Sequence, residues 1–256
     1  MAFANSDGVS IYYERHGDGP AVLFVHGSGG HHAAWWQQVA DLRSRFTVIT
    51  VDLRGFGKSD SSMPEFDGQD FPGDILAVLD QEDLTDVVLV GQSIGAVAAL
   101  RAGLSRPSRV SGVVLAHSLG GLADPELSEL VAADRSEAVK LPVLDRLLSK
   151  SFQENEPAKT FLFQQMGTFN VAKMADLRNL STGGPTVEEV VGSGLDVTFL
   201  AGENDAVLSA ATVRRAHALV KGSRLELIPD APHSMYWERP DLFNAAIVRV
   251  REAISA

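Results

Sequence analysis

Short, nearly continuous apolar runs recur along this chain, and they constrain its fold more than any other feature of the sequence. Five such runs are four to seven residues long and are separated by longer amphipathic or polar stretches. Runs of this kind are typical of strands that are buried on both faces of a mostly parallel sheet. They lie at 21–25, 46–51, 87–90, 110–116 and 197–201.

Helical patterns fill most of the stretches between these runs. Two further strands are predicted at 9–13, which is rich in β-branched and aromatic residues, and at 224–228. Strands that alternate with helices indicate an α/β fold with a mostly parallel central sheet flanked by helices. The helices of this alternating part are predicted at about 33–43, 73–80, 94–104, 210–220 and 240–254.

One region interrupts the alternation of strands and helices. Residues 122–182 contain no strand-like run, and the sequence Ser-Thr-Gly-Gly-Pro at 181–185 then returns the chain to the alternating pattern. We therefore expect an all-helical insertion at 122–182, between two parts of one core at 1–121 and 183–256. The helices of this insertion are predicted at about 126–133, 143–150, 157–167 and 171–180.

Charge and cysteine content exclude several kinds of function. The formal net charge is −11, and a surface this acidic repels phosphate backbones, so we expect no nucleic-acid partner. The 256 residues include no cysteine, which excludes disulfides, thiol catalysis and cysteine-ligated metals. No stretch approaches the roughly 20 apolar residues of a membrane helix, and the N-terminus lacks the pattern of a signal peptide. These features predict a cytoplasmic protein without a membrane partner; they indicate no oligomeric state.

The motif Gly91-Gln92-Ser93-Ile94-Gly95 is the strongest chemical signal in the chain. It follows the apolar run 87–90 and precedes the helix predicted at 94–104, which is the context of a nucleophile elbow. Such a turn is tight enough to require glycine beside the serine, and it presents the serine hydroxyl at the start of a helix. We predict that Ser93 is a nucleophile and that the backbone N–H of Ile94 binds an oxyanion.

A glycine-rich segment, His26-Gly27-Ser28-Gly29-Gly30, directly follows the run 21–25. A loop of this kind can bring a second backbone N–H toward the same oxyanion, and we assign that donor to Ser28. We interpret His26 as a structural residue that holds the loop by hydrogen bonds.

A serine nucleophile needs a histidine base and a carboxylate that fixes the histidine tautomer. Among seven histidines, His233 lies on the loop between the last predicted strand and the last predicted helix. From this loop it can reach over the carboxyl ends of the strands. The acid is expected between serine and histidine in the chain. Asp205 follows the run 197–201 and is our choice; Glu203 and Asp230 are the competing carboxylates.

The remaining histidines have simpler interpretations. His16 and His217 fit solvated positions, and His117 ends a predicted strand and could border the site. His31 and His32 could line a pocket or bind a metal, but a third ligand at suggestive spacing is absent from the sequence around them. We therefore predict no metal site.

Taken together, these motifs resemble those of the α/β-hydrolase superfamily, in its compact bacterial esterase-like branch. The resemblance implies the α/β-hydrolase fold, and it implies that the insertion at 122–182 is a helical lid. It also suggests that the segment 52–60 is a structural turn after a buried strand. The matching stretches span nearly the whole chain in the order of that family: 26–30, 52–60, 91–95, 202–205 and 232–233.

The same resemblance implies a serine hydrolase that cleaves a small or medium carboxylic ester or lactone, with a small-molecule substrate and no cofactor. Cofactor-free haloperoxidases and perhydrolases use the same triad and stay open as alternatives. Carbon–carbon bond hydrolases usually carry asparagine where Gln92 stands, and dehalogenases and epoxide hydrolases use aspartate in place of Ser93. A triad-bearing small-molecule receptor and a scaffold without chemistry are two further alternatives.

An apolar substrate pocket is expected beneath the lid and beside the loop 26–30. An alternative interpretation is that most of the aromatic residues there form the lid's own core, since aromatic residues at helical spacing usually pack internally. The residues proposed to line the pocket are Gln92, Trp35, Trp36, Phe161, Phe163 and Phe169.

Overall fold

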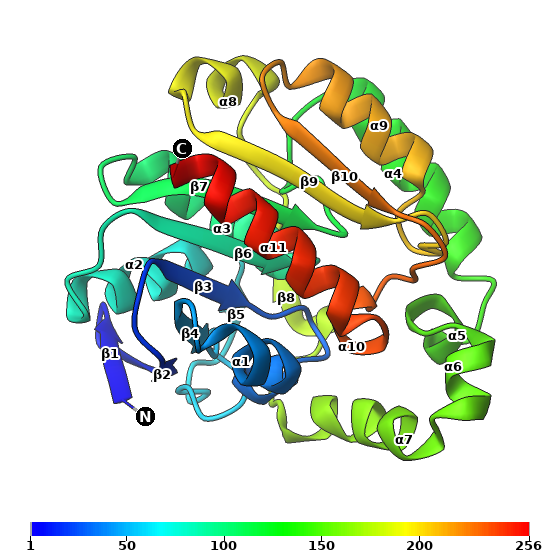
Figure 1. The fold of residues 1–256 in the computed structure, drawn as a ribbon, viewed down its shortest axis with the longest axis horizontal. Coiled ribbons are helices and arrows are strands. Elements are labelled where there is room, and N and C mark those ends of the chain that lie inside the picture. Colours follow the sequence, from blue (N-terminus) through cyan, green and yellow to red (C-terminus); the bar gives the residue numbers. More distant parts are fainter. Residues whose placement is uncertain (1, 256) are drawn as a thin grey trace.

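A computed structural model describes residues 2–255 and places them around one eight-stranded sheet (Figure 1). The strand order is β1-β2-β4-β3-β6-β7-β9-β10, and all neighbours from β4 to β10 run parallel. β1 and β2 form an antiparallel edge. The strands are β1 (Ala2–Ser6), β2 (Val9–His16), β3 (Ala21–Val25), β4 (Thr47–Val51), β6 (Val87–Gln92), β7 (Val110–Ala116), β9 (Asp196–Gly202) and β10 (Arg224–Ile228).

The apolar runs of the sequence form the central strands, as predicted. Every residue of β3, β4 and β6 is buried, because helices cover both faces of the sheet. One apolar layer joins the sheet to α2 (Phe71–Gln81), α3 (Ile94–Ser105) and α9 (Ala210–Leu219), and a second joins it to α1 (Trp36–Leu42) and α11 (Pro240–Ser255). The α/β fold expected from the sequence is therefore confirmed.

The segment 122–182 is mostly helical and lies beside the carboxyl ends of the strands and along one sheet edge (Figure 1). α4 packs along α9, and the shorter helices that follow extend past α10 (Met235–Glu238). The helices of this segment are α4 (Pro125–Ala138), α5 (Val143–Leu147), α6 (Lys150–Asn155) and α7 (Pro157–Met166), followed by the 3₁₀ turns η2 (Gly167–Phe169) and η3 (Met174–Asp176).

The helix predicted at 171–180 does not form. That stretch holds η3 and the two-residue strand β8 (Leu177–Arg178), which pairs in parallel with β5 (Phe66–Asp67). The backbone N–H of Ala172 donates to the carbonyl of Gly55, 2.9 Å away. These pairings with the loop after β4 satisfy backbone groups that a helix would satisfy internally, so tertiary contacts override the helical pattern. The insertion is helical but not all-helical.

The strands β1 and β5 and the helix α8 (Val187–Ser193) were not predicted from the sequence. For α8 the signal was present, since Thr186 and Glu189 form a capping box at its first turn. Gly194, with φ +71°, then ends this helix in the left-handed conformation. Among residues 2–255, no helix is long and apolar enough to cross a membrane.

The segment 52–60 connects β4 to the rest of the core through a buried ion pair. The Arg54 guanidinium lies 2.6 Å from Oδ1 of Asp74 on α2, and the Asp74 side chain is inaccessible to solvent. Arg54 also bonds Asp70, whose side chain is about half exposed. Ser59 Oγ donates to the carbonyl of Asp52 at 2.6 Å, which closes the turn on itself. These contacts support a structural role for 52–60.

We predict that Asp74→Ala lowers the free energy of unfolding by about 3–5 kcal/mol, because it leaves the Arg54 charge buried without its main partner. Asp70→Ala is the matched control and costs about 1 kcal/mol or less, since its exposed pair is screened by water. Urea unfolding of both variants measures the difference. A loss for Asp74→Ala no larger than that for Asp70→Ala would contradict the assignment.

Candidate active site

Ser93 sits on a strained turn between β6 and α3. Its backbone angles are φ 52° and ψ −114°, a conformation that costs a residue with a side chain of order 1–3 kcal/mol. The neighbouring glycines are required by space. A Cβ on Gly95 would lie 2.4 Å from the carbonyl oxygen of Val25, and one on Gly91 would lie 2.4 Å from Cα of Ala96. The motif therefore folds as the predicted elbow.

The loop after β3 packs directly against this elbow. A Cβ on Gly27 would lie 2.0 Å from Oε1 of Gln92 and 3.4 Å from Cβ of Ser93, so a side chain there would require the Gln92 amide to move. Ser28, the next residue, is partly exposed. The loop and the elbow are thus in contact where the two oxyanion donors, Ser28 and Ile94, were predicted.

His26 holds this loop in place, as the sequence suggested. The backbone N–H of Leu53 donates to His26 Nε2 at 3.2 Å, so the ring carries its proton on Nδ1. That Nδ1–H donates to the carbonyl of Gly27 at 2.8 Å. Burial lowers the pKa of His26, which favours this neutral ring. Both ring nitrogens are thereby engaged in bonds to the backbone.

His233 and Asp205 lie side by side at the carboxyl end of the sheet. His233 Nδ1 is 2.9 Å from Oδ2 and 3.0 Å from Oδ1 of Asp205. A carboxylate only accepts, so His233 donates from Nδ1 and its Nε2 is left as a base. Gln92 Nε2 reaches the His233 carbonyl at 3.5 Å and connects the elbow to this loop. Within residues 2–255, no hydrogen bond joins the Ser93 hydroxyl to His233.

The two competing carboxylates point elsewhere. Glu203 pairs with Arg214 at 3.2 Å on the surface. Asp230 accepts from Asn204 at 3.4 Å in an exposed position. The structure thus brings Asp205, rather than either competitor, to His233.

Asp205 is stabilised as an anion in a buried position. Its Oδ1 accepts from the backbone N–H groups of Val207 at 2.7 Å and Leu208 at 3.0 Å, and its Oδ2 also accepts from Nδ1 of His117 at 2.9 Å. Burial alone would raise the pKa of this carboxyl. The electrostatic interaction with His233 and the bonds from both histidines outweigh burial and hold the pKa of Asp205 below its ordinary value. From the sequence, His117 was expected only to border the site.

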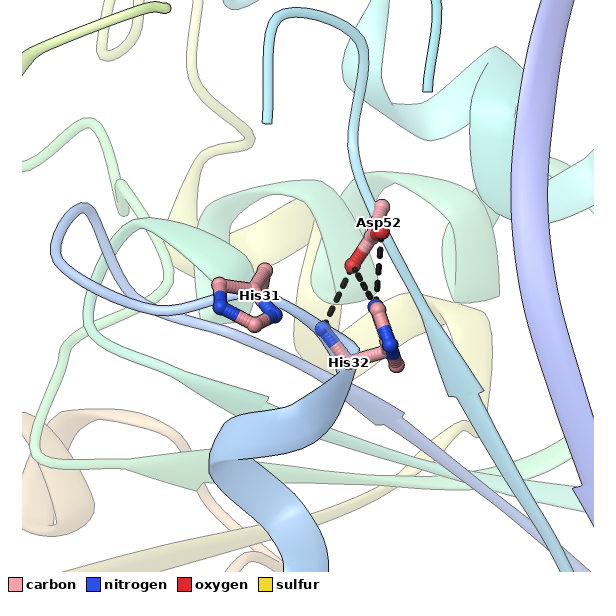
Figure 2. A group of neighbouring side chains, drawn as sticks. All are labelled: His31, His32 and Asp52. Atoms are coloured by element: carbon pink, nitrogen blue, oxygen red, sulfur yellow. Dashed lines mark hydrogen bonds and ion pairs between the residues drawn. The ribbon is translucent and has the colours of Figure 1, made fainter. Parts of the chain in front are cut away.

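A second buried cluster, His31, His32 and Asp52, lies at the start of η1 (His32–Trp35) (Figure 2). Its potential ligand atoms lie within 4.8 Å of one another, as do those of His117, Asp205 and His233. Asp52 is the third group that sequence spacing did not reveal. Its carboxylate already accepts from His32 Nδ1 at 2.8 Å and from the backbone N–H of Lys58 at 2.9 Å. The carboxylate of each cluster already accepts hydrogen bonds from histidine and backbone donors, and we assign no metal to either cluster.

The segment 122–182 is attached to the loop after β3 and to the loop that carries His233. On one side, Asn170 donates from Nδ2 to the carbonyl of Gly30 at 3.0 Å, and its Oδ1 accepts from the N–H of Gly57. On the other side, the N–H of Ser234 donates to the carbonyl of Leu147 at 2.9 Å. No sequence motif marked Asn170, because its partners are backbone groups of distant loops.

The predicted pocket residues fall into three environments. Trp35 is fully buried and packs against Phe24 and Tyr236, so it belongs to the core. Phe161 and Phe169 are exposed by 63% and 70% on the insertion. Gln92 is buried at the elbow, while the exposed Trp36 and the half-buried Phe163 both contact Trp237.

Known proteins resemble this chain over nearly its whole length. A sequence model described as "Alpha/beta hydrolase family" matches residues 22–246. A dihydrolipoyllysine-residue acetyltransferase component of an acetoin cleaving system from Cupriavidus necator is 26% identical over 254 residues, which cover 96% of this chain and 67% of that protein.

Two solved structures share the fold. A thermophilic esterase from Thermogutta terrifontis aligns with a TM-score of 0.83 and 23% identity, over 100% of this chain and 98% of its own. An enol-lactonase from Burkholderia xenovorans aligns with a TM-score of 0.80 and 22% identity, over 97% of this chain and 98% of its own. At these identities the likeness shows the fold.

The buried histidines make stability depend on pH. Burial lowers the pKa of His31 to about 4, whereas an unfolded histidine titrates near 6.5. The unfolded state therefore binds more protons between these values, and the free energy of unfolding falls as pH drops through that window. His31 Nδ1 accepts from the N–H of Ala33 and so caps η1. Asparagine can keep this cap without titrating.

We predict that wild-type protein loses stability between pH 7 and pH 5, and that His31→Asn loses less over the same interval. Urea unfolding at both pH values measures the two differences. If the His31→Asn protein shows the same pH dependence as wild type, the buried neutral state of His31 is contradicted.

Proposed function

The chain belongs to the alpha/beta hydrolase family, and on that premise we propose that it is a serine hydrolase that cleaves a small or medium carboxylic ester or lactone. Ser93 is the nucleophile, His233 the base and Asp205 the acid that orients it. The backbone N–H groups of Ser28 and Ile94 form the oxyanion hole. The observation that carries this proposal is the contact of His233 Nδ1 with both oxygens of Asp205 beside the strained elbow of Ser93.

The reaction begins with attack of Ser93 Oγ on the carbonyl carbon, while the hydroxyl proton passes to His233 Nε2. The carbonyl oxygen becomes an oxyanion, which the two backbone N–H groups stabilise by about 3–4 kcal/mol each. Asp205 balances the positive charge that His233 acquires. The tetrahedral intermediate collapses, the leaving alkoxide takes the proton from His233, and the acyl group stays on Ser93.

Water completes the turnover by the same steps. His233 takes a proton from water as the resulting hydroxide attacks the acyl carbon, and the second tetrahedral intermediate forms in the same oxyanion hole. Collapse breaks the bond to Ser93 Oγ, which regains the proton from His233 and releases the carboxylic acid. A lactone follows the same sequence, with the alcohol and the acid on one product.

The segment 122–182 serves as a lid that limits substrate size. Asn170 attaches it to the loop of the oxyanion donor Ser28, and Leu147 attaches it to the loop of His233. Its side chains Phe161 and Phe169 are exposed, and Phe169 contacts His31 edge-on with ring centres 6.1 Å apart. Apolar groups on this rim suit a substrate with an apolar acyl part. We propose Phe169 as the first of the lid residues to meet such a chain.

We predict that Ser93→Ala and Asp205→Asn each lower kcat by about 10³-fold or more on p-nitrophenyl esters or lactones, because the triad acts as a unit. Asp230→Asn is the matched control. It makes the same chemical change at an exposed carboxylate, whose positive φ of 54° asparagine tolerates, and it keeps nearly full activity.

Turnover by the wild-type protein and these variants is measured on a substrate panel in which ester chain length and lactone ring size are varied. Turnover in the usual enzymatic range of roughly 1–10³ s⁻¹ favours a hydrolase, whereas a single slow cleavage would favour a receptor. An active Ser93→Ala protein would contradict the proposed mechanism. If Asp230→Asn is inactive while Asp205→Asn is active, the acid is Asp230 rather than Asp205.

We also predict that Phe169→Ala shifts the preferred acyl chain length by severalfold in kcat/KM while the free energy of unfolding changes by less than about 1 kcal/mol, since this side chain is largely exposed. Phe152→Ala is the contrasting variant. Phe152 lies on α6 of the same segment but is buried in the apolar core, so its truncation costs about 3–5 kcal/mol. If Phe169→Ala leaves the chain-length profile unchanged, the pocket lies elsewhere.

A further inference from the structure

His117 is a second imidazole on the carboxylate of Asp205, and the proposed mechanism does not use it. It directly follows β7, the neighbour of the strand that carries Ser93. Its φ is +55°, an uncommon conformation for a residue with a side chain, and its N–H donates to the carbonyl of Leu200 at 2.7 Å. This strained turn directs the buried ring to Asp205, with Nδ1 2.9 Å from Oδ2.

The contacts of His117 define its protonation. Asp205 accepts, so His117 donates from Nδ1. Its Nε2 is buried and has no hydrogen-bond partner among residues 2–255. Protonation would place a second N–H at that nitrogen without an acceptor, and burial lowers the pKa of His117. The ionisable groups that act on this ring are Asp205 and His233, on the loops after β9 and β10. His117 is therefore a neutral donor.

The two oxygens of Asp205 are held differently. Oδ1 accepts from the backbone N–H groups of Val207 and Leu208, and from His233. Oδ2 accepts from two imidazoles, His117 and His233, at 2.9 Å each. Because Oδ2 has no backbone donor among these contacts, His117 alone shares it with His233. The strength of the electrostatic interaction between Asp205 and His233 therefore depends on the hydrogen bond from His117.

We propose that His117 is a positioning residue of the triad. Its Nδ1–H holds Oδ2 of Asp205 in place and partly neutralises the negative charge that acts on His233. This inference rests on the proposed function. Loss of the donor concentrates the charge of Asp205 on His233 and stabilises its protonated form. His233 then becomes the neutral base only at a higher pH.

Two substitutions at this position separate the donor from the fold. His117→Asn keeps an N–H donor near the position of Nδ1, and His117→Gly removes it; both residues tolerate a positive φ. We expect His117→Gly to lower kcat/KM by about tenfold or more and to move the acid limb of its pH profile upward by about half a pH unit. His117→Asn should keep most of the wild-type kcat/KM, and the acid limb of its pH profile should lie near the wild-type position.

The pH profile distinguishes positioning from a purely structural role. If His117 only supports packing, both variants lose activity in proportion to their folded fraction, and the acid limb stays in place once rates are corrected for folded protein. That result would overturn the proposal, as would a downward shift in the glycine variant. The limb is measured on a p-nitrophenyl ester that the wild-type protein hydrolyses.

A second readout needs no turnover, so the two proposals can fail separately. Imidazole ¹⁵N–¹H NMR at pH 7 should show, among the neutral histidines that carry the proton on Nδ1, one signal that is absent from the His117→Asn protein and perturbed by Asp205→Asn. The other tautomer at His117 would overturn this inference even in an active hydrolase. Absence of ester and lactone turnover by the wild-type protein, with the expected NMR signal present, would instead count against the proposed function.

Discussion

A buried negative charge at Asp205 organises this end of the molecule. Taking a carboxylate out of water is costly unless donors surround it, and the chain supplies two backbone N–H groups and two imidazoles. These donors come from different loops, after β7, β9 and β10, which meet at one edge because the strands run parallel. The anion therefore fixes how three loops sit beside the elbow of Ser93, and the orientation of His233 follows from it.

Backbone contact at close range provides the second constraint. Gly95 lies so near the carbonyl of Val25 that no side chain fits, and Gly27 lies against the side-chain amide of Gln92. These contacts fix the elbow relative to the loop after β3. The segment 122–182 then bridges the two sides of the site, because Asn170 bonds the loop after β3 and Leu147 bonds the loop of His233. A change in the lid would thus reach both the oxyanion loop and the base.

Local patterns predicted much of this arrangement. Continuous apolar runs identified the central strands, since burial on both faces leaves no polar positions, and the tight elbow requires the glycines that made Ser93 recognisable. Contacts between distant segments were harder to predict. β8 replaced an expected helix because it pairs with β5, and Trp35 lies in the core although its spacing also suited a pocket. The bonds from His117 to Asp205 and from His32 to Asp52 join residues 88 and 20 positions apart, without a sequence signature.

The proposed chemistry depends most on the identity of the nucleophile. A fluorophosphonate probe reacts with a serine that a neighbouring base has activated, and peptide mass spectrometry then locates the label. We expect one label, on Ser93, formed rapidly in the wild-type protein and lost in His233→Ala, with Ser28 and Ser234 unmodified. Label on another serine, or labelling of Ser93 at the same rate without His233, would contradict the assignment of Ser93 as a nucleophile activated by His233.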